Sequence, residues 1–401
     1  MPVADLYIVC KITLMIILGI ETSCDETAVS VVEAEGGLED LRFKVLGSAV
    51  NSQIEMHREF GGVVPNIAKR EHLKNLPLVL TEALKEAGLI FNFQFSIFNS
   101  ENPRIDLIAV TVGPGLEPAL WAGIKFAEEL GHKWNIPVIG TNHMEGHIAS
   151  VLFSKTEASF GFPAVALLVS GGHTELIYLN NWLEKEKIGH TLDDAVGEAF
   201  DKVARMLGLP YPGGPEISAL AEKARNSNIE IRDIKFPRPM LHSGNLNFSF
   251  SGLKTAVLYY IRGITHPKSL SYHKRGTFGE PPSLVVGEGG LGDELSDLQK
   301  MEIAREFEDA VIETLLTKTK KAIDQYNPKT LIIGGGVIAN KALRENLLNL
   351  EKDYPELKIL IPEKSLTTDN ATMIAAAGYI EYLREGGNKE LKAQGNLDIS
   401  S

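Results

Sequence analysis

Two histidines four residues apart have the spacing in this sequence that most clearly permits chemistry. His143 and His147, in the run HMEGH, would lie about 40° apart around a helix, so both imidazoles could bind one metal ion. An arbitrary pair of this kind is more often two unrelated surface histidines. Here the pair follows the short apolar segment IPVIGT, and α/β sheets bind ligands beyond their strand ends. Asp369 could supply a third ligand, although its plain role would be to cap the C-terminal helix.

A zinc protease is the first alternative that this pattern raises. In that class a glutamate directly follows the first histidine and acts on metal-bound water. Glu145 stands one position later, about 200° around the helix from His143, so it would point away from the metal. The protease hypothesis therefore lacks its general base.

Three glycine-rich turns are the second feature that could bind a ligand. They are LVSGG at 168–172, YPGGP at 211–215 and GGG at 334–336. Glycines there would let backbone N–H groups approach a phosphate or carboxylate, whereas Gly-Gly between two strands would also serve a plain hairpin. Three such turns at the ends of strands or helices favour a nucleotide-type ligand.

Asp201 is the third feature, and the residues alone leave its role open. It lies in the helical segment 195–208, off the apolar stripe that begins at Phe200. Its carboxylate could hold the hydroxyl groups of a ribose, or it could act as a favourable charge near the helix start. The two interpretations are equally supported at this point.

The surrounding elements indicate two related α/β domains, which the length of 401 residues also favours. Residues 15–32 and 162–179 each read as strand, turn, strand. Further strands are expected at 106–112 and 330–336, and helices at 68–87, 118–134, 195–208, 301–326 and from Asn370 onward.

These elements predict the domain boundaries. We expect 15–150 with 370–401 to form one domain and 151–369 the other. Residues 1–14 would be a disordered extension, with Met15 as an alternative start, and 263–298 would be a surface insertion because it is rich in Gly, Pro, Ser and acidic residues.

The composition predicts a soluble cytoplasmic protein that does not contact a membrane. Hydrophobic residues make up 44% and charged residues 23%, two cysteines fit a reducing compartment, and the apolar run at 7–20 is too short and broken to span a bilayer. The net charge of −12 argues against coating nucleic acid by bulk electrostatics. The basic runs at 69–74 and 318–321 could contact RNA, although solvated helix faces are the commoner role of such runs.

Seven motifs in one order resemble a single family. They are ILGIETSCDETAVSVV (17–32), HMEGH (143–147), LLVSGGHTEL (167–176), DDAVGEAFDKVARMLGLPYPGGP (193–215), FSFSGLKTA (248–256), GGGVIAN (334–340) and TDNATMIA (368–375). Across nearly all of 15–385 the sequence resembles the tRNA N6-adenosine threonylcarbamoyltransferases of the TsaD type, formerly called O-sialoglycoprotein endopeptidases. The turn ETSCDET and the run FGGVVP at 60–65 resemble the bacterial and organellar branch.

The resemblance implies a fold and a reaction. The fold would be the two-domain, actin-like fold of sugar kinases and heat-shock-chaperone ATPases, built from duplicated RNase H-like domains. The reaction would move the threonylcarbamoyl group from threonylcarbamoyl-adenylate to N6 of the adenosine 3′ of the anticodon, in tRNAs that read codons starting with A, with release of AMP. The implied partners are tRNA and the other bacterial subunits, of the TsaB and TsaE type.

The resemblance also implies a site without a protein nucleophile. One divalent metal ion, Fe²⁺ in preference to Zn²⁺, would be held by His143, His147 and Asp369. The substrate would contact Leu168, Val169, Ser170, Gly171, Gly172, Asp201, Gly214 and Asn340. An acidic contact that some relatives carry after PGGP stays unassigned, since Glu216 and Ser218 both stand nearby.

Two further functions remain as alternatives. An ATP-dependent sugar kinase could have the same fold, because fold does not settle function. Against it, Ser170 stands where kinases of that fold typically carry an aspartate, and the histidine pair would have no role. A scaffold that binds nucleotide and presents partners would tolerate loss of His143.

Overall fold

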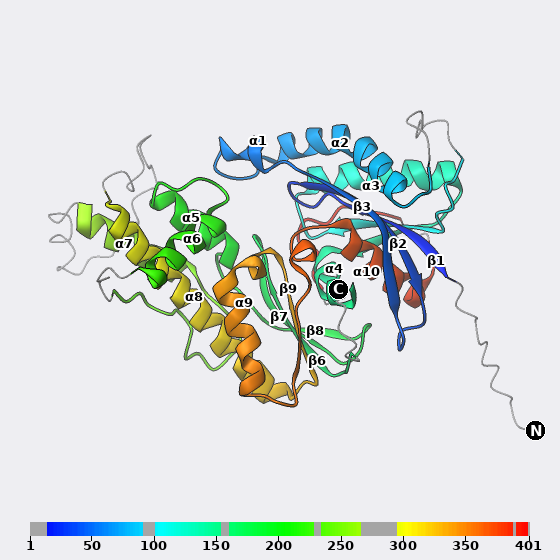
Figure 1. Cartoon of the computed structure of the whole chain (residues 1–401). Coiled ribbons are helices and arrows are strands. Elements are labelled where there is room, and N and C mark those ends of the chain that lie inside the picture. The colour runs from blue at the N-terminus through cyan, green and yellow to red at the C-terminus, as the bar shows by residue number, and fades with distance from the viewer. Residues whose placement is uncertain are drawn as a thin grey trace, which may run out of the picture. The chain divides into compact units, whose positions relative to one another are not determined.

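The computed structural model describes residues 14–90, 101–153, 160–227, 234–265, 295–387 and 390–399. The chain forms two compact units, drawn in Figure 1. The first comprises Met1–Asn51, Asn66–Phe153 and Asn370–Leu397, and the second comprises Ser52–Pro65, Ser154–Asp369 and Asp398–Ser401. Each unit is built around a five-stranded sheet.

The elements of the first unit surround the sheet β3-β2-β1-β4-β5. Its strands are β1 (Met15–Glu21), β2 (Glu26–Glu35), β3 (Arg42–Ser52), β4 (Leu107–Gly113) and β5 (Val138–Asn142). Its helices are α2 (Pro65–Glu86), α3 (Glu117–Trp134), α4 (His143–Ala149), the 3₁₀ turn η1 (Ser150–Phe153) and α10 (Ala371–Glu385).

The second unit has the sheet β10-β9-β6-β7-β8. Its strands are β6 (Ala164–Val169), β7 (Thr174–Leu179), β8 (Lys185–His190), β9 (Thr330–Gly334) and β10 (Lys358–Leu360). Its helices are α1 (Ile54–Arg58), α5 (Val196–Met206), α6 (Gly213–Asn226), α7 (Ser251–Thr265), α8 (Asp297–Tyr326), α9 (Lys341–Leu348) and the 3₁₀ turns η4 (Gly336–Ala339), η5 (Asn349–Lys352) and η6 (Lys364–Leu366).

The two sheets have the same connectivity. In the first, β1 pairs antiparallel with β2 and parallel with β4, which pairs parallel with β5. In the second, β6 pairs antiparallel with β7 and parallel with β9, which pairs parallel with β10. Read outward from the first strand of each sheet, the order and directions repeat. The duplicated two-sheet α/β architecture predicted above is therefore confirmed.

Helices cover both faces of the first sheet. Leu18 and Ile20 of β1 pack in the core with α2 and α3, whereas Ile17 packs in the core with α10. Figure 1 shows α10 on the opposite side of this sheet from α2 and α3. The backbone of α10 comes very close to β1, because a Cβ added at Gly19 would lie 2.1 Å from the carbonyl oxygen of Ala371.

Helices α5, α7 and α8 contribute to a single core with β6 in the second unit. Val165, Leu167 and Val169 alternate along β6 and all belong to this core. Phe200 of α5 and Phe307 of α8 meet edge to face, with ring centroids 5.1 Å apart. The core thus holds α5 against the sheet, and α5 carries Asp201.

The segment Ser52–Pro65 packs with the second unit although the sequence around it builds the first. The Nε atom of Arg58 donates to the carbonyl oxygen of Tyr211 at 3.1 Å, and the guanidinium of Arg205 donates to the carbonyl oxygen of Gly61. These bonds tie the segment to α5, through Arg205, and to the turn that follows α5, through Tyr211.

Two sequence-based predictions fall largely outside the described residues, namely the extension 1–14 and most of the insertion 263–298. The borders of the insertion are helical rather than irregular. Helix α7 continues to Thr265, and Ser296 caps α8 with a capping box, in which its side chain accepts from the backbone N–H of Gln299 and the Gln299 side chain accepts from the backbone N–H of Ser296. Within the described part of the chain, no helix combines the length and apolarity needed to cross a membrane.

Candidate metal centre and ligand-binding turns

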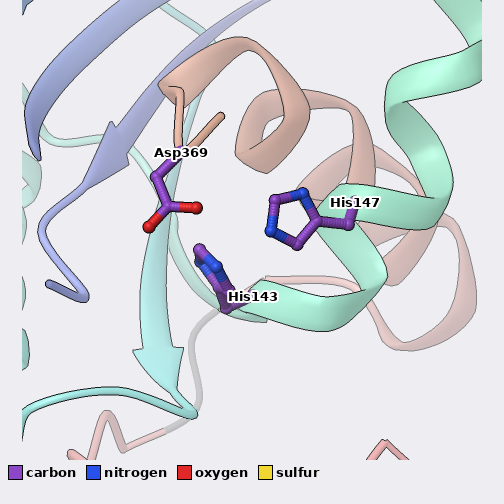
Figure 2. Close-up of side chains that lie close together, drawn as sticks. All are labelled: His143, His147 and Asp369. Atoms are coloured by element: carbon purple, nitrogen blue, oxygen red, sulfur yellow. The ribbon is translucent and has the colours of Figure 1, made fainter. Parts of the chain in front are cut away.

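His143, His147 and Asp369 form a group that could hold a metal ion. One potential ligand atom from each residue lies within 4.8 Å of those of the other two. Figure 2 shows the two imidazoles and the carboxylate pointing toward one another. His143 is 5% exposed and His147 is fully buried, whereas Asp369 is partly exposed, so the two imidazoles are shielded from solvent and the carboxylate less so. Two imidazole nitrogens and one carboxylate oxygen are a donor set that suits zinc or ferrous iron.

Local capping sets the position of each ligand. The side chain of Asn142 accepts from the backbone N–H of Met144 at 2.9 Å and so begins α4 at His143. The side chain of Asn370 accepts from the backbone N–H of Met373 at 2.9 Å. Asn370, and not Asp369, is therefore the N-cap of α10, and the capping role considered for Asp369 is wrong.

Gly146 explains the middle of the HMEGH motif. A Cβ added there would lie 2.9 Å from Cδ1 of Ile374 and 3.0 Å from Cγ of Met373, both on α10. A glycine at this position lets α4 approach α10, whose N-cap Asn370 directly follows Asp369. Glu145 does not belong to the metal-competent group, in agreement with the argument against a protease.

Glu21 is a residue at this centre that the sequence reasoning missed. It is the last residue of β1 and is fully buried, and its Oε2 lies 2.9 Å from Nδ1 of His143. Thr111 Oγ1 donates to the same oxygen at 2.7 Å, and the backbone N–H of Ser23 donates to Oε1. An ionisable residue that ends an otherwise apolar strand, in IILGIE, was the available signal.

The turn Ser170–His173 joins β6 to β7, so the plain hairpin role of these glycines is real. Leu168 and Val169 are fully buried in β6, so their contact with a ligand stays a prediction. Gly171 and Gly172 are exposed, and a Cβ added at either would meet nothing within 4 Å. The hairpin therefore leaves room beside the two glycines.

Asp201 lies in the middle of α5 rather than near its start, which corrects the proposed interaction with the dipole of its own helix. Its Oδ1 instead accepts from the backbone N–H of Gly213 at 2.7 Å, at the first residue of α6. The carboxylate thus caps a neighbouring helix. Gly214 follows, with nothing within 4 Å of an added Cβ.

Asn340 has a structural role at the start of α9. Its Oδ1 accepts from the backbone N–H of Leu343 at 2.8 Å. Its Nδ2 lies 2.6 Å from Ser218 Oγ of α6 and 2.6 Å from Oε1 of Glu308 of α8. Glu308 is 1% exposed, so a buried carboxylate orients the amide.

Contacts within the second unit join the predicted substrate residues to one another. The backbone N–H of Glu198 in α5 donates to the carbonyl oxygen of Gly171 at 3.1 Å. Asp201 connects α5 to α6, and Ser218 connects α6 to Asn340. Gly335, with a φ of +97°, brings η4 against β6, because a Cβ there would lie 2.4 Å from the carbonyl oxygen of Val169.

Salt bridges hold α5 and α7 together beside this region. Burial alone would raise the pKa of the Asp194 carboxyl, but hydrogen bonds and charge from Lys202 and Lys254 hold it below its usual value. Asp194 therefore stays ionised at neutral pH. Lys254, in the FSFSGLKTA motif, lies 2.7 Å from Oδ2 of Asp194.

The two basic runs differ in exposure. Lys318 is fully buried and donates to Ser243 Oγ at 2.7 Å and to the carbonyl oxygen of Asn245 at 2.8 Å. Lys318 is therefore unavailable for RNA, whereas Lys320 and Lys321 are partly exposed, and contact of this run with RNA stays a prediction. Arg70 and Lys74 are exposed on α2, and both pair with Glu71.

Comparison with known proteins identifies the family. The model of the family "TsaD: tRNA N6-adenosine threonylcarbamoyltransferase" matches residues 44–376. A protein of Bacillus subtilis named tRNA N6-adenosine threonylcarbamoyltransferase is 41% identical over 388 residues, covering 96% of each chain. One of Thermosipho melanesiensis with the same name is 45% identical over 366 residues, covering 91% of this chain and 94% of the relative.

Solved structures agree at the level of the fold. HypF of T. kodakarensis aligns with a TM-score of 0.52 and 13% identity, over 93% of this chain and 49% of HypF. The two repeated sheets agree with an actin-like, sugar-kinase-like α/β fold. Fold, motifs and full-length identity converge, and the chain belongs to the TsaD family of tRNA N6-adenosine threonylcarbamoyltransferases.

Proposed function

We propose that this chain transfers a threonylcarbamoyl group from threonylcarbamoyl-adenylate to N6 of the adenosine 3′ of the anticodon, in tRNAs that read codons starting with A. The observation that carries the proposal is the family match over 44–376. The convergence of His143, His147 and Asp369 within that range supports it further. The N6 amine forms the new C–N bond to the carbamoyl carbon, the bond to the phosphate oxygen breaks, and AMP and a proton are released.

No protein nucleophile is needed, because the adenylate already activates the carbonyl. The N6 amine is a weak nucleophile, so the chain contributes by holding the reactants together and stabilising the charge that develops on oxygen. We propose that the backbone N–H groups of Gly171 and Gly172 contact the acyl or phosphate part, together with Ser170 of the same turn and Leu168 and Val169 at the end of β6. Their support is the open space beside both glycines.

Asp201, Gly214 and Asn340 would hold the nucleoside part. The hydrogen bonds of Asp201 and Asn340 fix their side chains before any ligand binds. Such groups pay little additional conformational entropy on binding. The carboxylate of Asp201 would accept from ribose hydroxyl groups, which are donors of the right kind.

We assign the metal as Fe²⁺ in preference to Zn²⁺. A centre with two imidazoles and one carboxylate leaves coordination positions open for a substrate, and this donor set recurs at ferrous sites. When bound, the ion would supply Lewis acidity toward an oxygen of the donor. His143 and His147 would hold the ion from α4. Asp369, which stands directly before the N-cap of α10, would supply the third ligand.

The substrate tRNA implies a cytoplasmic location and favours help from partner subunits of the TsaB and TsaE type. A chain with a net charge of −12 is expected to attract a polyanion poorly on its own. A basic surface on a partner would supply the missing attraction, and that attraction should weaken as salt rises.

The direct test is transfer of a labelled threonylcarbamoyl group to unmodified tRNA, with and without partners, at low and moderate salt. We expect AMP release coupled to tRNA labelling, dependence on partners, and loss of both in His143→Ala. Phosphorylation of a sugar by ATP without tRNA labelling would favour the kinase alternative instead. Full transfer activity in His143→Ala would argue that the metal centre is dispensable, as a scaffold predicts.

A further inference from the structure

We infer that Glu21 is a positioning residue for the metal centre, and that it fixes the tautomer of His143. Its Oε2 lies 2.9 Å from Nδ1 of His143. A ring nitrogen at that distance from a carboxylate oxygen carries the proton and donates it. The lone pair of the neutral ring is then on Nε2, which becomes the ligand atom. This inference rests on the metal role proposed above for His143.

The sheet explains why these groups meet. Strands β1, β4 and β5 are parallel neighbours, so their carboxyl ends lie at one edge. Glu21 ends β1, Thr111 lies near the end of β4, and His143 directly follows β5. The three residues lie in or directly after three separate strands, so the strand pairing brings them to the same edge of the sheet.

The carboxylate itself is held in place. Thr111 Oγ1 donates to Oε2 at 2.7 Å, and the backbone N–H of Ser23 donates to Oε1. With the bond from His143, each oxygen accepts at least one hydrogen bond, so rotation of the carboxylate would break hydrogen bonds. Since the side chain is fully buried, a broken bond would not be replaced by bulk water.

Direct coordination by Glu21 is the competing role. The metal-competent group contains His143, His147 and Asp369 but not Glu21. Oε2 of Glu21 is engaged on the Nδ1 side of the His143 ring. A carboxylate that accepts a hydrogen bond from the non-ligating ring nitrogen of a metal-bound histidine orients the ring and raises its basicity. Loss of such a carboxylate typically weakens metal binding about 10- to 100-fold.

The test uses the full chain with Glu21→Ala and the nearly isosteric Glu21→Gln. Glu71→Gln is the matched control, because Glu71 is also a buried acid of the first unit, 5% exposed, but pairs with Arg70 and Lys74. Nitrogen-15 NMR of histidine in the metal-free protein reports the tautomer of His143. Competition with a chromophoric chelator gives the dissociation constant for Zn²⁺, and the visible spectrum of Co²⁺ reports coordination.

We expect Nδ1–H in the wild type and a shift toward Nε2–H in Glu21→Ala. Zn²⁺ binding should weaken by about 10- to 100-fold in Glu21→Ala and by a smaller factor in Glu21→Gln, whose single carbonyl oxygen can still accept from Nδ1. The Co²⁺ spectrum should keep its coordination pattern at saturation. Glu71→Gln should match the wild type in all three measurements.

Zn²⁺ affinity within twofold of the wild type in both variants, or an unchanged tautomer in a folded Glu21→Ala protein, would overturn the inference. A Co²⁺ spectrum that lost one ligand would overturn it too, in favour of direct coordination. If Glu21→Ala does not fold, Glu21→Gln decides alone. A wild-type chain that binds no Zn²⁺ or Co²⁺ would instead refute the metal centre itself. The NMR measurement would then still decide whether Glu21 fixes the tautomer of His143.

Discussion

Replacement of Asp201 separates a structural role from a ligand-binding role at one carboxylate. Its Oδ1 accepts from the backbone N–H of Gly213 at 2.7 Å, and this bond caps α6. Loss of a capping side chain costs about 0.5–2 kcal/mol. Loss of a charge-assisted hydrogen bond to a ligand costs about 1.5–3 kcal/mol, which corresponds to a roughly 10- to 150-fold weaker dissociation constant.

The two substitutions should therefore behave differently. Asp201→Ala should lower the free energy of unfolding by about 1 kcal/mol and also weaken ligand binding. Asp201→Asn keeps an oxygen that can cap α6, because Asn caps helices as well as Asp does, so its stability should stay near that of the wild type. It lacks the charge, and its affinity for the ligand should fall nearly as far as that of Asp201→Ala.

Calorimetry with AMP measures the affinity, and denaturant unfolding measures the stability. Glu198→Gln is the matched control, since Glu198 lies on the same helix and its side chain is 46% exposed beside Lys202. We expect this control to change neither quantity by much. AMP affinity that remains at the wild-type value in Asp201→Asn and Asp201→Ala would refute the ligand role and leave Asp201 as a cap alone.

Three further predictions concern the metal, the protease alternative and acid stability. His143→Ala should lose most bound Zn²⁺ by metal analysis while circular dichroism stays near the wild type, and full occupancy would contradict the assignment. Glu145→Gln should keep its metal, and neither it nor the wild type should cleave peptides with added Zn²⁺ or Fe²⁺; cleavage abolished by this change would revive the protease. Burial alone would raise the pKa of Asp193, but hydrogen bonds from Ser249, Ser251 and the backbone lower it. The contribution of Asp193 to the free energy of unfolding should thus be present above about pH 4 and lost as pH falls through the lower native pKa. The difference in the free energy of unfolding between the wild type and Asp193→Ala, measured by urea denaturation, should therefore become smaller at acid pH.

The sequence predicted those elements whose local pattern is strong. The apolar, β-branched runs of β1 and β6 predict buried strands. The segment that carries the two histidines was predicted to be helical, and it forms α4. Strand β3 was missed because most of its residues are partly or fully exposed and show no clean alternation. Strand β10 has only three residues, too few for any period.

Tertiary contacts explain where residue-level predictions failed. Lys318 looks like a surface charge of a long helix, but Ser243 and Asn245 cover it from a loop more than 70 positions away. The capping partner of Asp201 lies on another helix, so no rule about its own helix could find it. The three metal ligands were predicted, and the structure brings them together. The substrate contacts stay predictions.

The place of α10 in the chain has a consequence for protein synthesis. This helix packs against β1, β2, β4, β5 and α4, yet it spans residues 371–385. A ribosome would have made every other helix and strand of the first unit long before α10 emerges. Domains generally fold as units as they are synthesised, so this unit must wait with one face of its sheet uncovered. Because Asp369 immediately precedes Asn370, the N-cap of α10, the group of two histidines and one carboxylate is complete only once this late segment has been synthesised.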